Sequence, residues 1–352
     1  MNEVNGLYSI KELMVEAYNR NASDLHLTVG AKPTFRINGG LVFFGENILE
    51  TSDTDSFIKD LVTDHQLAEF LEKGDLDFSY GIEKVSRFRI NIYKQRSTAS
   101  LAIRMIPRTI PDLDQLGADP ILKTFVEKPQ GLVLVTGPTG SGKSTTLAAM
   151  IGLINQTENK HIITLEDPIE YLHKHGKSLI NQREIGVDSS SFATALRSTL
   201  RQDPDVILVG EMRDLETIST AITAAETGHL VFGTLHTTDA ANTIDRIIDV
   251  FPVYQQSQIR LQLSNVLVGI VAQRLIPTIN RDGRVVAMEI LINTPAIANL
   301  IRTEKTHQIK TLMQTGKSFG MQTMEAALKN LVNLQKIDEQ TAKQMVVNWD
   351  RA

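Results

Sequence analysis

The sequence predicts a smaller α+β domain followed by an α/β domain with a largely parallel sheet. From Gly131 onward, short apolar stretches alternate with helical segments, which is typical of a parallel sheet covered by helices. Before residue 107, apolar and polar residues alternate along paired segments, which favours antiparallel strands. The length of 352 residues is sufficient for about two domains.

The first domain is predicted to comprise residues 1–106. A helix is expected near its start, where apolar residues recur at helical spacing: Ile10, Leu13, Met14, Ala17 and Tyr18. Strands at 34–37 and 41–44 flank Asn38-Gly39-Gly40, a strong hairpin signal. A second strand pair is expected at 86–93 and 99–106.

Residues 107–120 are predicted to be a linker, because Pro107, Pro111 and Pro120 interrupt regular structure there. The second domain is then expected at 121–352. Its strands are predicted at 132–136, 161–165, 206–209 and 230–235. After about Asp239 the pattern becomes mostly helical, with one further strand near 284–292.

Composition narrows the function classes. The formal net charge of −5 argues against a general nucleic-acid binder, which would more often be basic. The chain has no cysteine, which excludes disulfides and a cysteine zinc site. We expect no signal peptide, because the N-terminal residues lack an apolar core of sufficient length, and no apolar run approaches the ~20 residues that span a bilayer. These patterns predict a soluble cytoplasmic protein that reaches a membrane only through a partner.

One motif carries most of the chemistry. The pattern G-x-x-x-x-G-K-[ST] occurs in the stretch Gly137-Pro138-Thr139-Gly140-Ser141-Gly142-Lys143-Ser144. It lies between an apolar run at 132–135 and a helix-prone stretch at 145–154, the context that a phosphate-binding P-loop requires. Glycines let successive N–H groups point into one cavity, and the helix N-terminus adds partial positive charge. The alternative, a glycine-rich turn with an isolated lysine, does not account for this context.

The P-loop predicts a bound nucleoside triphosphate, ATP, with Mg²⁺. We expect the eight residues of the motif and the adjacent Thr145 to bind it. Lys143 can reach the β- and γ-phosphates, and the Ser144 hydroxyl can ligate Mg²⁺.

A hydrolytic site also needs acidic partners, and two predicted strands end in acids at Glu166 and Glu211. Gly210 occupies the position at which a Walker B element usually has aspartate. Glu211 is therefore expected to serve Mg²⁺ directly or through water, or to act on the attacking water. Glu166 is the other candidate for polarising that water. For each acid, the alternative is a solvated charge at a strand end.

His229 and His236 bracket the predicted strand at 230–235. A polar cluster beside a nucleotide can sense the γ-phosphate and couple it to motion, so both are catalytic candidates. A structural role is equally open for each. We interpret His26, His173 and His175 as structural.

Arginines of the first domain form another candidate group. Arg87 and Arg89 share one strand face by the period of two, and Arg104 is expected on the neighbouring strand. From the residues alone, a solvated strand face is the better explanation. The functional alternative is recognition of an anion across a domain or subunit boundary.

Together, the P-loop, the acidic segment 164–171, the segment 210–214 and the histidine segment 228–238 resemble the secretion ATPases of type II secretion and type IV pili. Segments 22–27 and 228–252 are especially similar to the pilus retraction branch of that family. The resemblance covers nearly the whole chain.

The resemblance implies a PAS-like N-terminal domain, a RecA-like ATPase core and a homohexameric ring. It implies contacts of Arg87, Arg89 and Arg104 with phosphate, and an inner-membrane platform protein and other pilus ATPases as partners. It also implies a place at the inner face of the cell membrane. Extension-type relatives usually carry a longer N-terminal region and a four-cysteine zinc motif. This chain has neither, which favours retraction.

One segment departs from the retraction pattern Ala-Ile-Arg-Asn-Leu-Ile-Arg-Glu. At 296–303, Ala298 and Thr303 replace the arginine and the glutamate. We expect Ile297, Leu300 and Ile301 to form a buried helix face, with Ala298 off it.

Three other functions remain open at this stage. An extension or secretion motor of the same superfamily would share these motifs. An accessory ring subunit would bind ATP but hydrolyse it poorly, which the intact set of Lys143, Ser144, Glu166 and Glu211 argues against. A DNA-transfer ATPase is disfavoured because no concentrated basic patch occurs.

Overall fold

The computed structural model describes residues 8–37, 39–106, 109–281 and 283–346. The chain divides into two compact units between Thr109 and Ile110, with Glu170–Leu172 grouped with the N-terminal unit. This division falls inside the predicted linker, of which Pro107 lies outside the described residues. Each unit has its own hydrophobic core, and the two are described separately.

Six strands of the described residues form an antiparallel sheet in the N-terminal unit, in the order β3-β2-β1-β6-β5-β4. They are β1 (Asp24–Leu27), β2 (Thr34–Ile37), β3 (Gly40–Phe43), β4 (Asp75–Ile82), β5 (Ser86–Gln95) and β6 (Thr98–Met105). Both predicted strand pairs are confirmed as β2–β3 and β5–β6. The predicted hairpin residue Asn38 lies outside the described residues.

Helices cover one face of this sheet. They are α1 (Ile10–Asn19), α2 (Thr51–Leu61) and α3 (Asp64–Lys73). The predicted first helix is confirmed as α1, which begins with a capping box between Ser9 and Glu12 and buries four of the five apolar residues that predicted it. Alternate residues of the strands, such as Leu25, Ile90 and Ile103, pack against these helices in one core.

The C-terminal unit contains the mostly parallel sheet. Its seven strands among the described residues have the order β13-β12-β7-β11-β10-β8-β9. They are β7 (Gly131–Thr136), β8 (His161–Glu166), β9 (Leu179–Glu184), β10 (Val206–Val209), β11 (Leu230–Leu235), β12 (Leu267–Pro277) and β13 (Arg284–Ile292). All neighbours pair in parallel except β12 and β13. The four strands predicted for the first half of this domain are confirmed as β7, β8, β10 and β11.

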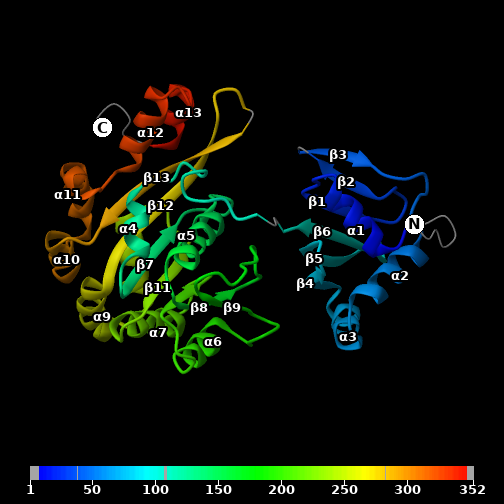
Figure 1. Cartoon of the computed structure of the whole chain (residues 1–352), viewed down its shortest axis with the longest axis horizontal. Helices are drawn as coiled ribbons and strands as arrows, with labels where there is room; N and C mark the ends of the chain where they lie inside the picture. The colour runs from blue at the N-terminus through cyan, green and yellow to red at the C-terminus, as the bar shows by residue number, and fades with distance from the viewer. Residues whose placement is uncertain (1–7, 38, 107–108, 282, 347–352) are drawn as a thin grey trace. The chain divides into compact units, whose positions relative to one another are not determined.

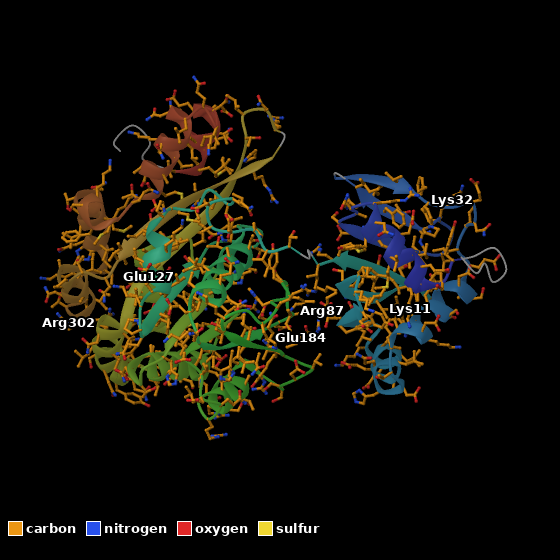
Figure 2. All side chains as sticks on the ribbon, in the orientation of Figure 1. Lys11, Lys32, Arg87, Glu127, Glu184 and Arg302 are labelled. Atoms are coloured by element: carbon orange, nitrogen blue, oxygen red, sulfur yellow. The ribbon has the colours of Figure 1, made fainter. Side chains whose placement is uncertain are left out.

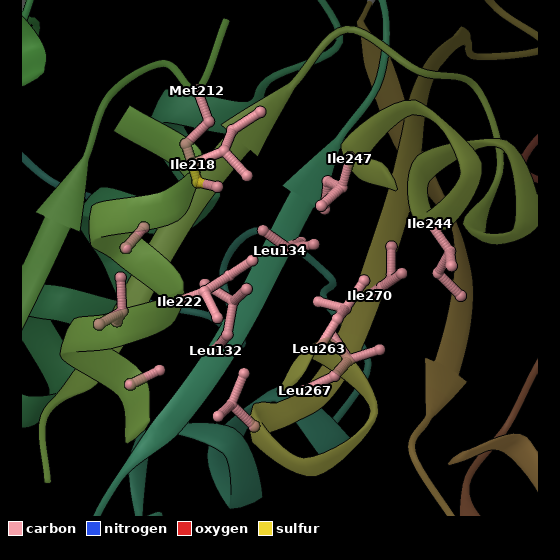
Figure 3. Packing of buried hydrophobic residues seen from close by; sticks show 14 of the residues in the cluster. Leu132, Leu134, Met212, Ile218, Ile222, Ile244, Ile247, Leu263, Leu267 and Ile270 are labelled. Carbon is pink, nitrogen blue, oxygen red and sulfur yellow. The ribbon is translucent and has the colours of Figure 1, made fainter. Parts of the chain in front are cut away.

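Helices lie on both faces of this sheet (Figure 1). One face packs against α4 (Ile121–Val126) and α5 (Lys143–Thr157). The other packs against α6 (Phe192–Thr199), α7 (Leu215–Glu226), α8 (Ala240–Asp249), α9 (Val253–Val266), α10 (Pro295–Arg302) and α11 (Ile309–Thr315). Figure 3 shows how β7 and β12 place Leu132, Leu134 and Ile270 among the apolar side chains of this second face. Because helices cover both faces, the ends of the strands are where a ligand can reach polar groups of this sheet.

The second half of this domain differs from the prediction of a mostly helical region with one strand. In addition to β13, the 11-residue strand β12 runs from Leu267 to Pro277. It follows α9 directly, without a proline or turn sequence at the junction. The apolar residues of β12 therefore fall within the predicted helical region, because periodicity alone cannot distinguish a buried strand from a buried helix.

Two C-terminal helices, α12 (Met324–Asn333) and α13 (Glu339–Met345), pack near the ends of β12 and β13. Short 3₁₀ turns at Thr306–Gln308 and Gly316–Phe319 precede them. Glu289 of β13 connects this region to α8, because its carboxylate accepts from the N–H groups of Ala240 at 2.8 Å and Met324 at 3.4 Å. Burial raises the pKa of Glu289, and these two helix N-termini oppose that rise.

Helix α10 contains the segment that departs from the retraction pattern. Ile297, Leu300 and Ile301 are buried as predicted, but Ala298 is buried as well, at 8% exposure. The prediction that Ala298 lies off the buried face is therefore wrong, because the apolar face of α10 is wider than three residues define. Arg302 is exposed on the outer surface of this helix (Figure 2).

No helix among the described residues is long and apolar enough to cross a bilayer.

Candidate active site at the edge of the parallel sheet

The predicted P-loop connects β7 to α5. Gly137, Gly140 and Gly142 have φ angles of 144°, 78° and 88°, which side chains other than hydrogen rarely tolerate. A Cβ atom on Gly137 would lie 2.4 Å from the carbonyl oxygen of Gln273 and 2.6 Å from Ser141 Oγ. Glycine is thus required for the loop to curl this closely against β12.

The first turn of α5 carries the residues predicted to hold phosphate and metal. Because α5 begins at Lys143, the side chains of Lys143, Ser144 and Thr145 all lie at its N-terminus. The ammonium of Lys143 lies over the loop and donates to the carbonyl oxygens of Gly137 at 2.8 Å and Pro138 at 3.2 Å. A cation, a hydroxyl and a curled backbone at one helix N-terminus fit a magnesium-bound polyphosphate.

Both predicted acids lie at the same edge of the sheet as the P-loop. β10 is two strands from β7 in the sheet, and β8 is three strands away. With strands spaced about 4.8 Å apart, the backbone near Glu211 lies about 10 Å from β7 and that near Glu166 about 14 Å. Glu211 is therefore better placed to reach the metal or the attacking water.

Two neighbouring side chains fix the position of the Glu211 carboxylate. Its Oε1 lies 2.8 Å from Nε2 of His236 and also accepts from Nε of Arg213. The contact with Glu211 raises the pKa of the Arg213 guanidinium. The carboxylate is only 21% exposed, so His236 and Arg213 restrict its rotamers.

Gly210 explains the departure from the usual Walker B sequence. A Cβ atom at this position would lie 2.9 Å from the carbonyl oxygen of Leu165 and 3.3 Å from Cα of Glu166. The Gly210 N–H also donates to the same Leu165 oxygen at 2.7 Å. The close approach of β8 to β10 leaves no room for an aspartate, and the acid stands one residue later.

Glu166 has a different environment. Its Oε1 accepts from the Thr164 hydroxyl at 2.6 Å and from Nε2 of Gln182 at 3.0 Å. Two neutral donors thus orient this carboxylate, which lies half-buried at the end of β8.

The structure separates the two predicted histidines. His236 follows β11 at the P-loop edge, whereas His229 precedes the same strand. Because β11 has six residues, His229 lies at the opposite edge of the sheet, about 20 Å away. Its Nδ1 bonds the carbonyl oxygen of Ala224, in the last turn of α7, at 2.9 Å. Within this chain His229 therefore lies away from the P-loop, and its catalytic role stays a prediction.

A cavity of about 370 Å³ adjoins Glu211 and His236. Arg213, Thr237 and Arg246 also contribute to its walls. No group of three or more histidine, cysteine, aspartate or glutamate side chains suited to a metal ion occurs among the described residues.

The sequence profile of the family described as Type II/IV secretion system protein matches residues 6–282. The chain belongs to this family.

Individual relatives extend the similarity to almost the full length of the chain. The chain is 49% identical over 335 residues to a protein of Pseudomonas aeruginosa described as "Type IV pilus retractation ATPase PilT", covering 95% of this chain and 97% of that protein. It is 46% identical over 341 residues to a "Twitching motility protein" of Neisseria gonorrhoeae, covering 97% and 91%. A solved structure, "Crystal Structure of the Pilus Retraction Motor PilT and Bound ADP", matches with a TM-score of 0.91 at 47% identity, covering 98% of this chain and 99% of that one.

The three predicted arginines lie on the polar face of the N-terminal sheet, opposite its helices. Arg89 and Arg104 are direct neighbours across β5 and β6, and Arg87 lies two residues from Arg89. Within this unit they already have partners, because Arg89 bonds Asp77 and Arg104 bonds Asp24 at 3.1 Å. Arg87, labelled in Figure 2, donates to Ser79 Oγ at 2.5 Å.

Sequence reasoning missed three residues of this edge: Arg213, Arg246 and Gln273. Arg213 could have been found, because it lies two residues after Glu211 in the same segment. Arg246 faces the cavity from α8, and only the fold brings it there. Gln273 was missed together with its strand β12, although a polar residue within an apolar run is itself a signal.

Proposed function

We propose that the chain is an ATP-hydrolysing motor that powers the retraction of type IV pili. The observation that carries this proposal is the P-loop at the start of α5, with the bonded pair Glu211 and His236 at the same edge of the sheet. The described relatives supply the biological context, since one is a pilus retraction ATPase and one a twitching motility protein.

The residues of this edge divide the work of hydrolysis. The P-loop N–H groups and Lys143 bind the phosphates and stabilise negative charge that develops during transfer. Ser144 would hold Mg²⁺, with Glu211 directly or through water, and the ion supplies charge neutralisation on the phosphates. Glu211 accepts a proton from or orients the attacking water, and His236 and Arg213 hold its carboxylate. Glu166 assists from one strand further away.

The architecture proposed for this motor is a RecA-like core with a PAS-like N-terminal domain, assembled as a homohexamer. In such a ring, the arginines at 87, 89 and 104 would approach the phosphates bound by the same or a neighbouring subunit. Their present aspartate and serine partners would exchange for phosphate oxygens, which the planar guanidinium binds well. The motor would act on an inner-membrane platform protein at the inner face of the membrane, together with other pilus ATPases.

A mixing experiment tests the ring and the shared site. Lys143→Ala protein is added to wild type in increasing fractions, and steady-state ATP hydrolysis is measured. We expect activity to fall more steeply than the wild-type fraction, because a defective subunit would impair its neighbours. Arginine contacts supplied by a neighbouring protein contribute about 10³ to 10⁵ in rate in other NTPases. Activity strictly proportional to the wild-type fraction would show independent subunits.

The direction of the motor needs a test in cells. Deleting the gene and imaging fluorescent pili should give cells whose pili extend but do not retract. Cells that make no pili would support the alternative of an extension motor. Normal pilus dynamics together with very slow hydrolysis by the purified protein would favour an accessory ring subunit.

A further inference from the structure

Gln273 is a buried amide beside the P-loop. It lies on β12 and is only 1% exposed. The residues that precede it on this strand are apolar or glycine. Ala272 pairs with Thr136 in the parallel ladder, so Gln273 stands next to the point where β7 leaves the sheet to form the loop. A polar side chain buried at this point requires a specific partner.

That partner is the P-loop backbone. Nε2 of Gln273 donates to the carbonyl oxygen of Ser141 at 2.7 Å. A Cβ atom on Gly142 would lie 3.2 Å from the same nitrogen. The backbone oxygen of Gln273 lies where a Cβ of Gly137 would clash. One residue of β12 thus contacts the loop at its beginning and at its end.

The orientation of this amide is enforced. Oε1 of Gln273 is buried and has no hydrogen-bond partner among the residues that the structure describes. Turning the amide over would place this oxygen against the Ser141 oxygen, so that two acceptors would face each other. The side chain therefore makes one hydrogen bond to the loop and leaves its other polar atom unsatisfied, which costs stability.

We infer that Gln273 is a positioning residue for phosphate binding, acting through the peptide between Ser141 and Gly142. In a trans peptide the C=O and the following N–H point in opposite directions. By drawing the Ser141 oxygen toward β12, Gln273 turns the Gly142 N–H away from β12 and toward the concave side of the loop. This inference rests on the proposed nucleotide site.

Replacing the amide by an apolar side chain of similar length tests the inference. We expect Gln273→Met to bind Mg-ADP roughly tenfold more weakly than wild type, because a single hydrogen bond that orients the loop is lost. Binding is measured by titration calorimetry, and folding is checked separately by the thermal unfolding midpoint without nucleotide.

A second variant provides a readout that a merely structural role would not move. In Gln273→Glu, the protonated acid can still donate to the Ser141 oxygen, whereas the carboxylate would oppose that oxygen and the phosphates. Burial and nearby phosphate raise the pKa of such a carboxyl group. Mg-ADP affinity of this variant should therefore increase as the pH falls from 8 to 6, by severalfold more than that of wild type.

Asn293 offers a matched control. Its Nδ2 donates to the carbonyl oxygens of Ser264 at 2.9 Å and Leu267 at 2.8 Å, and its Oδ1 is also buried without a partner in the described part of the chain. It follows Ile292, which pairs with Gly269, about 13 Å along β12 from Gln273 and toward the opposite edge. Asn293→Leu should lower the unfolding midpoint and leave Mg-ADP affinity unchanged.

The outcomes separate this inference from the proposed function. Wild type that binds no Mg-ADP would overturn both. Wild type that binds, with Gln273→Met binding equally well, would overturn only the role of Gln273. If Gln273→Met does not fold, Gln273→Glu decides, and an affinity difference from wild type that does not change with pH overturns the inference. Equal losses of affinity in Asn293→Leu and Gln273→Met would reduce the effect to general destabilisation.

Discussion

The two sheets of this protein carry their charged residues in different places. The parallel sheet is sealed by helices on both faces, and its reactive groups lie at one edge. The N-terminal sheet has helices on one face only, and Arg87, Arg89 and Arg104 stand in rows on the other. A site at an edge depends on loop backbone and on a few glycines, whereas a site on a face depends on side chains spaced by the period of two.

Because of this difference, we expect the two regions to tolerate amino-acid substitutions unequally. At the edge, a single added carbon atom at Gly137 or Gly210 meets backbone atoms. On the polar face, the arginines have exchangeable partners, and Arg104 is 69% exposed although it bonds Asp24. We therefore expect the largest functional losses at the edge.

The largest effect is expected for Lys143→Ala. Loss of a donor that stabilises transferred phosphate should lower kcat by about 10²- to 10³-fold. The unfolding midpoint should change little, because Lys143 is half-buried and its bonds to Gly137 and Pro138 are made from the loop surface. Phosphate release under saturating ATP measures the effect. Lys123→Ala, which removes an exposed pair with Asp114, is the control and should retain activity. A near-normal kcat for Lys143→Ala would remove the P-loop from the mechanism.

Replacing the acid that lies nearer to β7 should slow hydrolysis more than replacing the other. We expect Glu211→Gln to slow hydrolysis by about 10²- to 10⁴-fold and Glu166→Gln by less, because Glu166 lies one strand further away. Both variants should still bind Mg-ADP, which checks that the loop is intact. A larger loss for Glu166→Gln would show that strand order does not decide which acid activates water.

Ala298→Arg tests stability rather than catalysis, because it places an arginine on a buried helix face. We expect destabilisation of about 1–3 kcal/mol from overpacking, since Ala298 is 8% exposed on α10. Urea unfolding measures it. Asn299→Arg, at the adjacent exposed position, should be nearly neutral. Equal stability of the two variants would show that α10 shifts to admit the larger side chain.

An effect of similar size concerns His173, which burial keeps neutral by lowering its pKa to about 4 from an ordinary value of 6.5. Between these values the unfolded chain binds a proton and the folded chain does not, so stability must fall as the pH falls from 6.5 toward 4. The slope approaches ~1.4 kcal/mol per pH unit for one proton. His173→Gln should lack this contribution, and the difference between the two unfolding curves at pH 7 and pH 5 measures it. Parallel curves would place the imidazole in solvent.

The sequence predicted the P-loop and the strands of the first half of the larger domain because each rests on local rules. The P-loop needs glycines at fixed spacing, and β7, β8, β10 and β11 are short apolar runs bounded by polar residues. The acids Glu166 and Glu211 could be predicted as candidates for the same reason, since Glu166 ends β8 and Glu211 lies two residues after β10.

The rest depended on relations between distant segments. The separation of His229 from His236 follows from the direction of β11, which places the two ends of one strand at opposite edges. β12 follows α9 without a proline or turn sequence between them, so the strand was not predicted. The contact of Gln273 with Ser141, 132 residues away in the chain, could therefore not be predicted either. The width of the buried face of α10 likewise depends on what packs against it, and three apolar residues did not reveal it.

The packing around Gly210 limits which residues this position can accept. The position resembles a lapse in a motif, yet the space that would receive the aspartate is filled by the backbone of Leu165 and Glu166. An aspartate at position 210 would not complete the motif, because β8 would first have to move. While β8 keeps its path, position 210 can accept no side chain, so any substitution there would have to come with a shift of the neighbouring strand.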